Sequence, residues 1–203
     1  MGTGSAARRV GLFGGSFDPV HLAHLALARR ALDELALDEL RWIPAGQPWQ
    51  KARAVSPAAD REAMVRLAIA GEPRFVLDDR ELRRTGPSYT IDTVRELQAE
   101  QPGVHWVLVI GQDQLAGLHT WRGWQELLGL VTLAVARRPG EARPVNPQVQ
   151  AAGHEPLSLP MMDISSTEIR ARVAEGRGIA ELVPEGVARY IDQHRLYAGP
   201  PRS

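Results

Sequence analysis

Short apolar runs, rich in β-branched residues, alternate along the chain with longer segments in which apolar residues recur every three or four positions. The runs are typical of strands and the longer segments of amphipathic helices. We predict strands at residues 10–13, 40–43, 74–77, 106–110, 131–136 and 156–159. We predict helices at residues 22–36, 58–70, 90–101, 124–128, 165–175 and 184–194.

This alternation predicts an α/β fold: a Rossmann-like, doubly wound parallel sheet with helices on both faces, followed by a C-terminal helical segment. We expect the strand order 3-2-1-4-5, which makes the first and fourth strands neighbours. In such a sheet, a ligand binds in the crevice outside the carboxyl ends of these two strands. The first strand leads to Gly14 and Gly15 at that edge, and the fourth leads to Gly111 and Asp113.

The length of 203 residues fits one domain. We predict that this domain covers residues 10–197, after a disordered extension at residues 1–9 and before a tail at residues 198–203. The segments 44–57 and 137–153 are rich in proline and glycine and predict long loops. Loops of that length in a compact domain are often functional.

Composition narrows the class of partner. Lys plus Arg equals Asp plus Glu at 24 each, whereas nucleic-acid binders usually carry a basic excess. The absence of cysteine excludes disulfides, thiolate catalysis and cysteine-ligated metals. No apolar run approaches the roughly 20 residues of a membrane span, and no secretory signal is evident at residues 1–9. We therefore expect a cytoplasmic protein that binds small molecules and neither nucleic acid nor membrane; whether it forms a homo-oligomer stays open.

The segment after the first predicted strand reads Gly-Gly-Ser-Phe-Asp-Pro-Val-His-Leu-Ala-His. Gly14 and Gly15 would allow a backbone path closed to other residues and let a ligand approach the main chain. His21 and His24 share one face of the first helical turn, beside unpaired N–H groups. Free amides and imidazole donors at a helix N-terminus suit a polyphosphate. The alternatives are a chance turn or a metal site built on the two histidines.

A second candidate phosphate site opens the predicted helix at residues 165–175. Ser165 and Glu168 have the spacing of a capping box, which explains neither Thr167 nor Arg170. Helix-terminal amides and hydroxyls donate to phosphate oxygens, and a guanidinium adds a bidentate charged contact. We predict a phosphate site here, with a simple helix cap as the alternative.

Both motifs resemble signatures of the nucleotidyltransferase superfamily: Gly-Gly-x-Phe-Asp-Pro-x-His-x-Gly-His, from which only Ala23 departs, and Ile-Ser-x-Thr-x-x-Arg. From about residue 10 to 197, the chain is more narrowly similar to bacterial nicotinate-nucleotide adenylyltransferases. Further segments carry this resemblance: Pro-Ser-Tyr-Thr at 87–90, Ile-Gly-Gln-Asp at 110–113, Thr-Trp at 120–121 and Val-Ala-Arg-Arg-Pro-Gly at 135–140. The resemblance implies the nucleotidyltransferase fold in its His-x-Gly-His form.

The resemblance also implies an activity: transfer of the AMP moiety of ATP to nicotinate mononucleotide, giving deamido-NAD and pyrophosphate without a covalent enzyme intermediate. The residues that it assigns to ATP, the first three of them catalytic, are His21, His24, Arg170, Gly14, Gly15, Phe17, Gly111, Asp113, Ser165 and Thr167. Those assigned to the mononucleotide are Lys51, Tyr89, Thr90, Trp121, which would stack on the nicotinate ring, and Arg122. Mg²⁺ is expected to arrive with ATP rather than at a protein metal site, because the motifs contain no carboxylate cluster.

Two departures from the family pattern bear on specificity. Gln50 stands where relatives carry a histidine, although the basic residue after it survives as Lys51. Arg122 replaces a common aromatic residue, and our hypothesis is that its charge favours the acid over the amide. The alternatives are adenylyl transfer to nicotinamide mononucleotide, to both acceptors or to phosphopantetheine, and a nucleotide-sensing protein on the same fold. The sensing hypothesis predicts a damaged catalytic motif, and this motif is intact.

Overall fold

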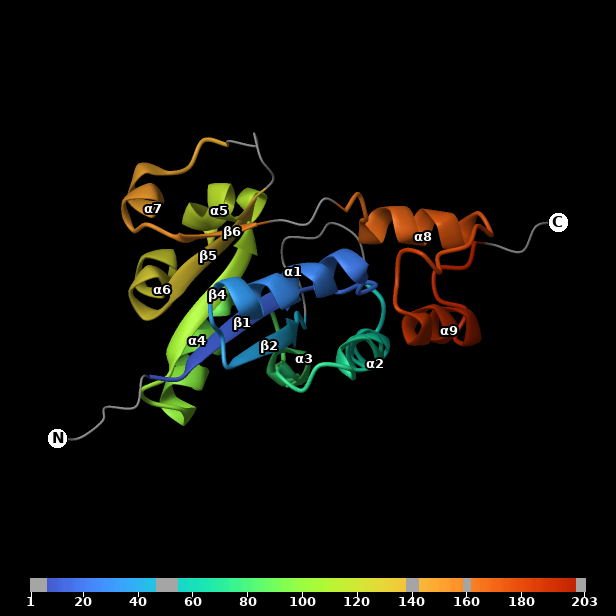
Figure 1. Cartoon of the computed structure of the whole chain (residues 1–203), viewed down its shortest axis with the longest axis horizontal. Helices are drawn as coiled ribbons and strands as arrows, with labels where there is room; N and C mark the ends of the chain where they lie inside the picture. Colours follow the sequence, from blue (N-terminus) through green and yellow to red (C-terminus); the bar gives the residue numbers. More distant parts are fainter. Residues whose placement is uncertain (1–6, 47–54, 138–142, 159–161, 200–203) are drawn as a thin grey trace.

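A computed structural model of the chain describes residues 7–46, 55–137, 143–158 and 162–199. Within these residues, six parallel strands form one sheet in the order β3-β2-β1-β4-β5-β6 (Figure 1). The strands are β1 (Arg9–Gly15), β2 (Glu39–Pro44), β3 (Phe75–Leu77), β4 (His105–Gly111), β5 (Thr132–Arg137) and β6 (Glu155–Ser158). The predicted order is confirmed, and β6 extends it by one strand.

The helices in the described part of the chain are α1 (Leu22–Glu34), α2 (Ala58–Ile69), α3 (Arg80–Arg83), α4 (Thr90–Glu100), α5 (Gln112–Gly117), η1 (Leu118–Thr120), α6 (Trp124–Leu130), α7 (Pro147–Ala151), α8 (Ser166–Ala174) and α9 (Glu185–Gln193). Each predicted helix is present with nearly the predicted bounds. The prediction of a loop at 137–153 is wrong where α7 forms. Pro147 occupies its first turn, and the Asn146 side chain accepts a hydrogen bond from Gln148 N–H, so proline and asparagine start a helix here.

Alternate residues of β4 face opposite layers of the molecule. Val107 and Val109 pack with α1, α2, α8 and α9, whereas Trp106, Leu108 and Ile110 pack with α4, α5, α6 and α7. All five side chains are at most 4% exposed. A strand covered on both faces is apolar at every position, which explains the continuous apolar run in the sequence.

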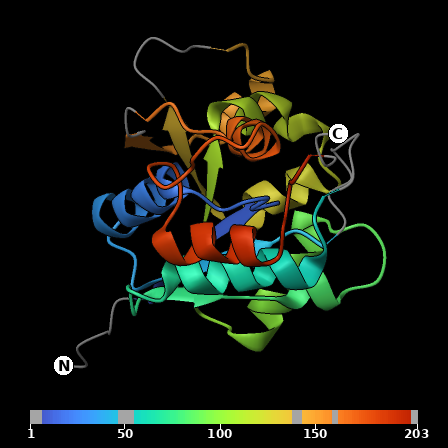
Figure 2. The ribbon, with the colours of Figure 1, turned by 90° about the vertical axis from the view of Figure 1, so that its right-hand side faces the viewer.

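The connections place the site at one edge of this sheet. The chain leaves β1 towards β2 and β3 and returns to β4 on the other side of β1. The carboxyl ends of β1 and β4 therefore meet where the winding reverses. The C-terminal part returns to the same edge: Leu22 N–H at the start of α1 donates to Leu182 O over 2.9 Å. Figure 2 shows α9 lying alongside α2.

No helix in the described ranges is long and apolar enough to cross a lipid bilayer. The division into a domain at residues 10–197 and terminal extensions stays a prediction. Most of the predicted loop at residues 44–57 lies outside the described residues.

Candidate active site

A cavity of about 460 Å³ opens at the carboxyl ends of β1 and β4. This volume lies within the range of about 300–1,000 Å³ usual for small-molecule sites. Its walls come from the end of β1 and the turn after it, the ends of β2 and β4, the turn after η1, and parts of α1, α3, α4, α5 and α8. The crevice predicted from the strand order is therefore present.

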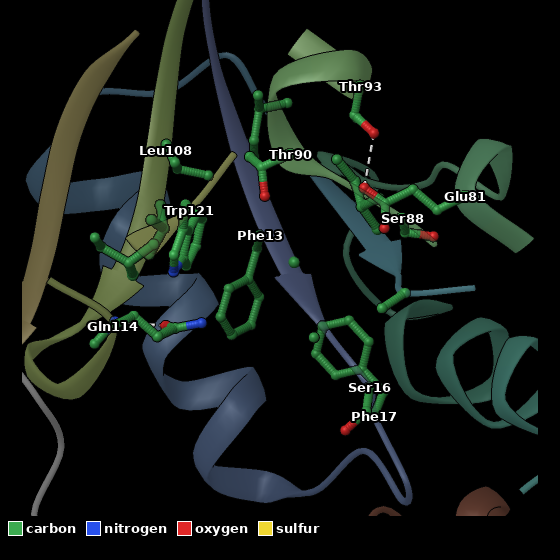
Figure 3. A pocket seen from close by; sticks show the side chains of 18 of the residues that line it. Phe13, Ser16, Phe17, Glu81, Ser88, Thr90, Thr93, Leu108, Gln114 and Trp121 are labelled. Carbon is green, nitrogen blue, oxygen red and sulfur yellow. Dashed lines mark hydrogen bonds between the residues drawn. The ribbon is translucent and has the colours of Figure 1, made fainter. Parts of the chain in front are cut away.

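The cavity brings together predicted site residues from distant parts of the chain. Those that line it are Gly14, Gly15, Phe17, His24, Tyr89, Thr90, Gly111, Trp121 and Arg122. Those that do not are His21, Asp113, Ser165, Thr167 and Arg170, and Lys51 lies outside the described residues. Figure 3 shows Trp121 and Gln114 on one side, Glu81 and Ser88 on the other, and Phe13 between them.

The two glycines end β1, and neither has a positive φ. The predicted backbone path closed to other residues is therefore wrong for both. Gly15 is needed for a different reason, because a Cβ there would lie 2.9 Å from Cε1 of Phe17. The residue with a positive φ in this turn is Phe17, at 46°. Its ring packs edge-on against the rings of Phe13 and His24, and this packing stabilises the unusual backbone.

His21 and His24 open α1 as a stacked pair, with ring centroids 3.6 Å apart. The backbone N–H of His21 donates to Nδ1 of His24 over 3.2 Å. An Nδ1 atom that accepts a hydrogen bond carries no proton, so a neutral His24 carries its proton on Nε2. His24 lines the cavity. It can therefore offer a neutral N–H donor to a phosphate oxygen.

His21 lies beneath this ring and is only 6% exposed. Burial lowers the pKa of its imidazole from 6.5 to about 4. Its Nδ1 atom is buried without a hydrogen-bond partner among the described residues. At neutral pH the His21 ring is uncharged, and it supports His24 by stacking rather than by charge.

In the second phosphate motif, one of the two hydrogen bonds of the predicted capping box is present, the one accepted by the Ser165 side chain. Ser165 caps α8, and its hydroxyl accepts a hydrogen bond from Glu168 N–H over 3.2 Å. The Glu168 carboxylate accepts from Arg172 Nε at 2.8 Å, one turn further along the helix. The helix cap and the phosphate hypothesis are compatible, because Ser165 holds the start of α8 in place.

The start of α8 is joined to the β1–α1 turn. Arg170 Nη1 donates to Asp18 O over 2.7 Å, and its Nη2 donates to Thr167 Oγ1 over 3.1 Å. The hydroxyl of Ser166, which lines the cavity, donates to Pro19 O over 2.9 Å. Hydrogen bonds therefore hold the two phosphate motifs, which are far apart in the chain, side by side.

At the end of β4, Gly111 lines the cavity together with Gln114. The Gln114 side chain accepts a hydrogen bond from Gly111 N–H over 2.9 Å and thereby caps α5. The Asp113 side chain is 74% exposed and pairs with Arg143 at 2.9 Å. The structure thus places Gly111, but not Asp113, at the cavity wall.

At the start of α4, Tyr89 is the N-cap residue and Thr90 is the first helical residue. The Arg122 guanidinium lies over the Tyr89 ring, 4.8 Å from its centroid. The turn after Arg122 depends on Gly123, which has a φ of 64° and leaves little space for a Cβ beside Ile91. This turn presents both Trp121 and Arg122 to the cavity.

Several positions in the cavity wall were missed by sequence reasoning. Glu81 and Thr93 line the cavity, and the Thr93 hydroxyl donates to Glu81 Oε1 over 2.7 Å. Burial raises the pKa of the Glu81 carboxyl. The Ser88 hydroxyl accepts from Gly46 N–H over 3.2 Å. Ser88 adjoins the predicted Tyr89 and could have been found, whereas Glu81 gives no signal because a charged residue in a short helix usually indicates the surface.

Arg61 is a further missed position, on α2 and only 1% exposed. Its guanidinium donates to four backbone carbonyls, those of Ser16 at 3.0 Å, Ala45 at 2.6 Å, Gly46 at 3.1 Å and Ser56 at 3.0 Å. Arg61 therefore fixes the turn after β1 against the end of β2. Within the described part of the chain, no group of three or more His, Cys, Asp or Glu side chains could hold a metal ion.

Comparisons with known proteins agree with this geometry. Residues 12–172 match the family described as cytidylyltransferase-like. A protein of Methylibium petroleiphilum, named "Probable nicotinate-nucleotide adenylyltransferase", is 53% identical over 98% of this chain and 96% of its own length. A protein of the same name from Bordetella petrii is 51% identical over 94% and 99%.

The fold has a counterpart among solved structures. Plasmodium falciparum nicotinic acid mononucleotide adenylyltransferase complexed with NaAD superposes with a TM-score of 0.77 at 17% identity, over 94% of this chain and 97% of that one. Since the sequence matches extend over nearly the whole chain, the chain belongs to the cytidylyltransferase-like family and, within it, to the nicotinate-nucleotide adenylyltransferases.

Proposed function

We propose that the protein transfers the AMP moiety of ATP to nicotinate mononucleotide, giving deamido-NAD and pyrophosphate. One observation carries this proposal beyond family membership. A single cavity joins the wall formed by His24 and Ser166 to the wall formed by Tyr89, Trp121 and Arg122. The first wall suits a polyphosphate and the second an aromatic ring with a negative charge, so both substrates would meet within one cavity.

The proposed ATP site uses donors that are already in place. His24 offers its Nε2–H to oxygens at the α- and β-phosphates, and His21 orients it. Arg170, Thr167 and Ser165 at the start of α8 would contact the β- and γ-phosphates, with the helix N-terminus adding its amides. Gly14, Gly15, Phe17 and Gly111 would form the wall around the nucleotide, and Asp113 stays a predicted ATP contact. Mg²⁺ would enter as part of the Mg-ATP substrate.

The reaction needs orientation more than proton transfer. The 5′-phosphate of the mononucleotide, already ionised near neutral pH, attacks the α-phosphorus in line, and pyrophosphate leaves. Fixed donors stabilise the charge that develops on the bridging oxygen, and the cavity brings two anions into contact. No enzyme nucleophile is required, because the attacking phosphate is itself an ionised nucleophile.

The proposed acceptor site distinguishes the nicotinate carboxylate from the nicotinamide amide by presenting hydrogen-bond donors. Trp121 would stack on the nicotinate ring, while the backbone N–H groups at the start of α4 and the Arg122 guanidinium would receive the carboxylate. An amide would also require an acceptor for its NH₂ group. Lys51 is proposed to neutralise a substrate phosphate.

The proposed partners are these small molecules, and the cytoplasmic location expected from the sequence stays a prediction. Two solved structures of the Plasmodium falciparum enzyme are complexes with NaAD and with APC, which supports small-molecule ligands for this fold.

The proposal is tested by incubating the protein with Mg-ATP and nicotinate mononucleotide and measuring pyrophosphate and dinucleotide together. Equal amounts of the two products are expected. If neither nicotinate nor nicotinamide mononucleotide gives a product, the proposed acceptor is wrong and phosphopantetheine is the next candidate.

A further inference from the structure

Asp18 is a buried carboxylate in the turn that follows β1. It is 0% exposed, and it directly follows the cavity-lining residues Ser16 and Phe17. Its Oδ1 accepts a hydrogen bond from the Tyr197 hydroxyl over 2.7 Å, and its Oδ2 accepts from Ser56 N–H over 3.4 Å. A buried charge is costly unless it has such partners, so these donors are important for this turn.

Tyr197 reaches this turn from 179 positions further along the chain. Its φ is 63°, a value that a bulky residue keeps only when its surroundings hold it. Burial and the hydrogen bond to Asp18 both raise the pKa of the phenol. The hydroxyl therefore keeps its proton, and Tyr197 is the donor in this bond.

Other elements hold the same turn. Arg61 on α2 donates to Ser16 O over 3.0 Å, and its positive charge favours the nearby Asp18 carboxylate. From α8, Arg170 donates to Asp18 O and Ser166 to Pro19 O. Tyr197 binds the Asp18 side chain from the C-terminal segment, and it is not among the residues that line the cavity.

We propose that Tyr197 is a positioning residue for the phosphate site: through Asp18, its hydroxyl fixes the β1–α1 turn that places Phe17 and His24 in the cavity wall. The expected fall in kcat rests on the proposed function. The effect of the Tyr197 hydroxyl on the β1–α1 turn does not depend on which acceptor the enzyme uses. Without the hydroxyl, Asp18 loses a donor and the turn samples other positions.

The alternative is a purely structural hydrogen bond, and the chain offers a matched control. Tyr190 on α9 also donates its hydroxyl to an aspartate, Asp60 on α2, over 2.9 Å. Neither Tyr190 nor Asp60 lines the cavity. Tyr197→Phe and Tyr190→Phe each remove one hydroxyl from a tyrosine–aspartate pair and keep the ring, but only the first pair includes the phosphate turn.

Five properties of both variants are measured: Tm, the Kd for Mg-ATP by calorimetry without acceptor, amide hydrogen exchange over residues 14–24, kcat, and KM for the mononucleotide. We expect Tyr197→Phe to weaken ATP binding by about tenfold and to lower kcat by more than that, since a misplacement of about 1 Å can cost about 100-fold in rate. Exchange over residues 14–24 should accelerate, and KM for the mononucleotide should stay unchanged. Tyr190→Phe should change Tm alone.

A double-mutant cycle tests the route through Asp18. Asp18→Asn keeps the shape of the side chain, and residues that act through one another are non-additive. Tyr197→Phe should therefore weaken ATP binding less in the Asp18→Asn background than in the wild type.

The proposal is overturned if Tyr197→Phe lowers Tm while the Kd for ATP and the exchange over residues 14–24 stay at wild-type values. Full additivity with Asp18→Asn would also contradict it. A wild-type protein that binds ATP but does not use nicotinate mononucleotide would refute only the proposed acceptor. The ratio of the Kd for Mg-ATP in Tyr197→Phe to that in the wild type would still test the role of Tyr197. If the wild type binds no ATP, the role of Tyr197 is tested by hydrogen exchange over residues 14–24. Faster exchange in Tyr197→Phe than in Tyr190→Phe supports the proposal, and equal exchange contradicts it.

Discussion

Buried polar side chains join the cavity wall formed by the β1–α1 turn and α8 to α2 and to the C-terminal segment. On the wall that carries Tyr89, Trp121 and Arg122, the buried polar contacts are more local and join Glu81 to Thr93 and Ser88 to Gly46. On the first wall, Asp18 and Arg61 are 0% and 1% exposed and bind several segments at once. On the second wall, Arg122 is exposed and contacts the ring of Tyr89.

This difference suggests that the first wall determines the catalytic rate and the second wall the choice of acceptor. Phosphate donors stabilise a transition state only when they are fixed beforehand, which the first wall achieves by hydrogen bonds from α2, α8 and the C-terminal segment. The second wall recognises one ring and its substituent, and side chains there can change without disturbing the core. Substitutions on the first wall should therefore affect kcat and stability, and those on the second wall KM and acceptor choice.

The largest effect is expected for His24→Ala. Removing one preorganised donor typically costs about 10²–10³ in kcat. His105→Ala, at the opposite end of β4, should leave kcat unchanged. Steady-state kinetics with saturating Mg-ATP measures both variants, and a loss of less than about tenfold for His24→Ala would contradict its assignment.

Stability of the first wall should depend on pH through His21. Its pKa is 6.5 in the unfolded chain and about 4 in the fold, so the unfolded state takes up a proton first as the pH falls. Stability is therefore expected to fall between about pH 6.5 and pH 4, by about 3 kcal/mol from this group, since one pKa unit is about 1.4 kcal/mol. Urea unfolding at several pH values should show a flatter profile for His21→Asn and an unchanged one for His154→Asn.

Arg61→Lys tests how much the hydrogen bonds from Arg61 to backbone carbonyls stabilise the first wall. A lysine cannot satisfy the four carbonyls that Arg61 binds, and one unsatisfied buried group costs about 1–3 kcal/mol. We expect a loss of about 2 kcal/mol in urea unfolding, with a lower kcat. The same substitution at Arg66, an exposed position on the same helix, should change stability by less than about 0.5 kcal/mol. Equal losses at both positions would show that the carbonyl contacts do not matter.

Trp121→Ala tests the second wall. Stacking of a base on an aromatic side chain is worth about 1–3 kcal/mol, so KM for the mononucleotide should rise about tenfold or more while the Kd for ATP stays constant. Trp124, which does not line the cavity, provides the control as Trp124→Ala. A rise in the Kd for ATP with Trp121→Ala would mean that the two walls are not separate sites.

The smallest effect is expected for Arg122→Ala. Exposed charges contribute up to about 1 kcal/mol, so the acid-to-amide ratio of kcat/KM should fall by about fivefold or less. Arg122→Lys retains the charge and should keep most of the preference. An unchanged ratio in Arg122→Ala would refute the hypothesis that this charge favours the acid.

The strands and the crevice could be predicted because they follow from local patterns. The apolar run of β4 indicates a strand buried on both faces, and alternating elements give the strand order that brings β1 beside β4. The short helices α3 and α7 were not predicted, because one helical turn is too short to show a period.

The contacts that hold the phosphate turn could not be predicted from the sequence. Arg61 lies on the same face of α2 as the buried Met64 and Val65, but this spacing does not show what a charged side chain there would contact, and only the fold reveals the four carbonyls around it. Tyr197 and Asp18 are joined across 179 positions, and no local signal indicates such a pair. The two glycines were correctly placed at the cavity but for the wrong reason, since the aromatic packing of Phe17 became visible only in three dimensions.

Acceptor choice is the most direct test of the whole account. Nicotinate and nicotinamide mononucleotides are supplied together at equal concentration with Mg-ATP, and the two dinucleotide products are separated and quantified. Their initial ratio equals the ratio of the two kcat/KM values. The account predicts a large excess of deamido-NAD. Equal amounts of the two products, or an excess of NAD, would contradict the proposed acceptor site.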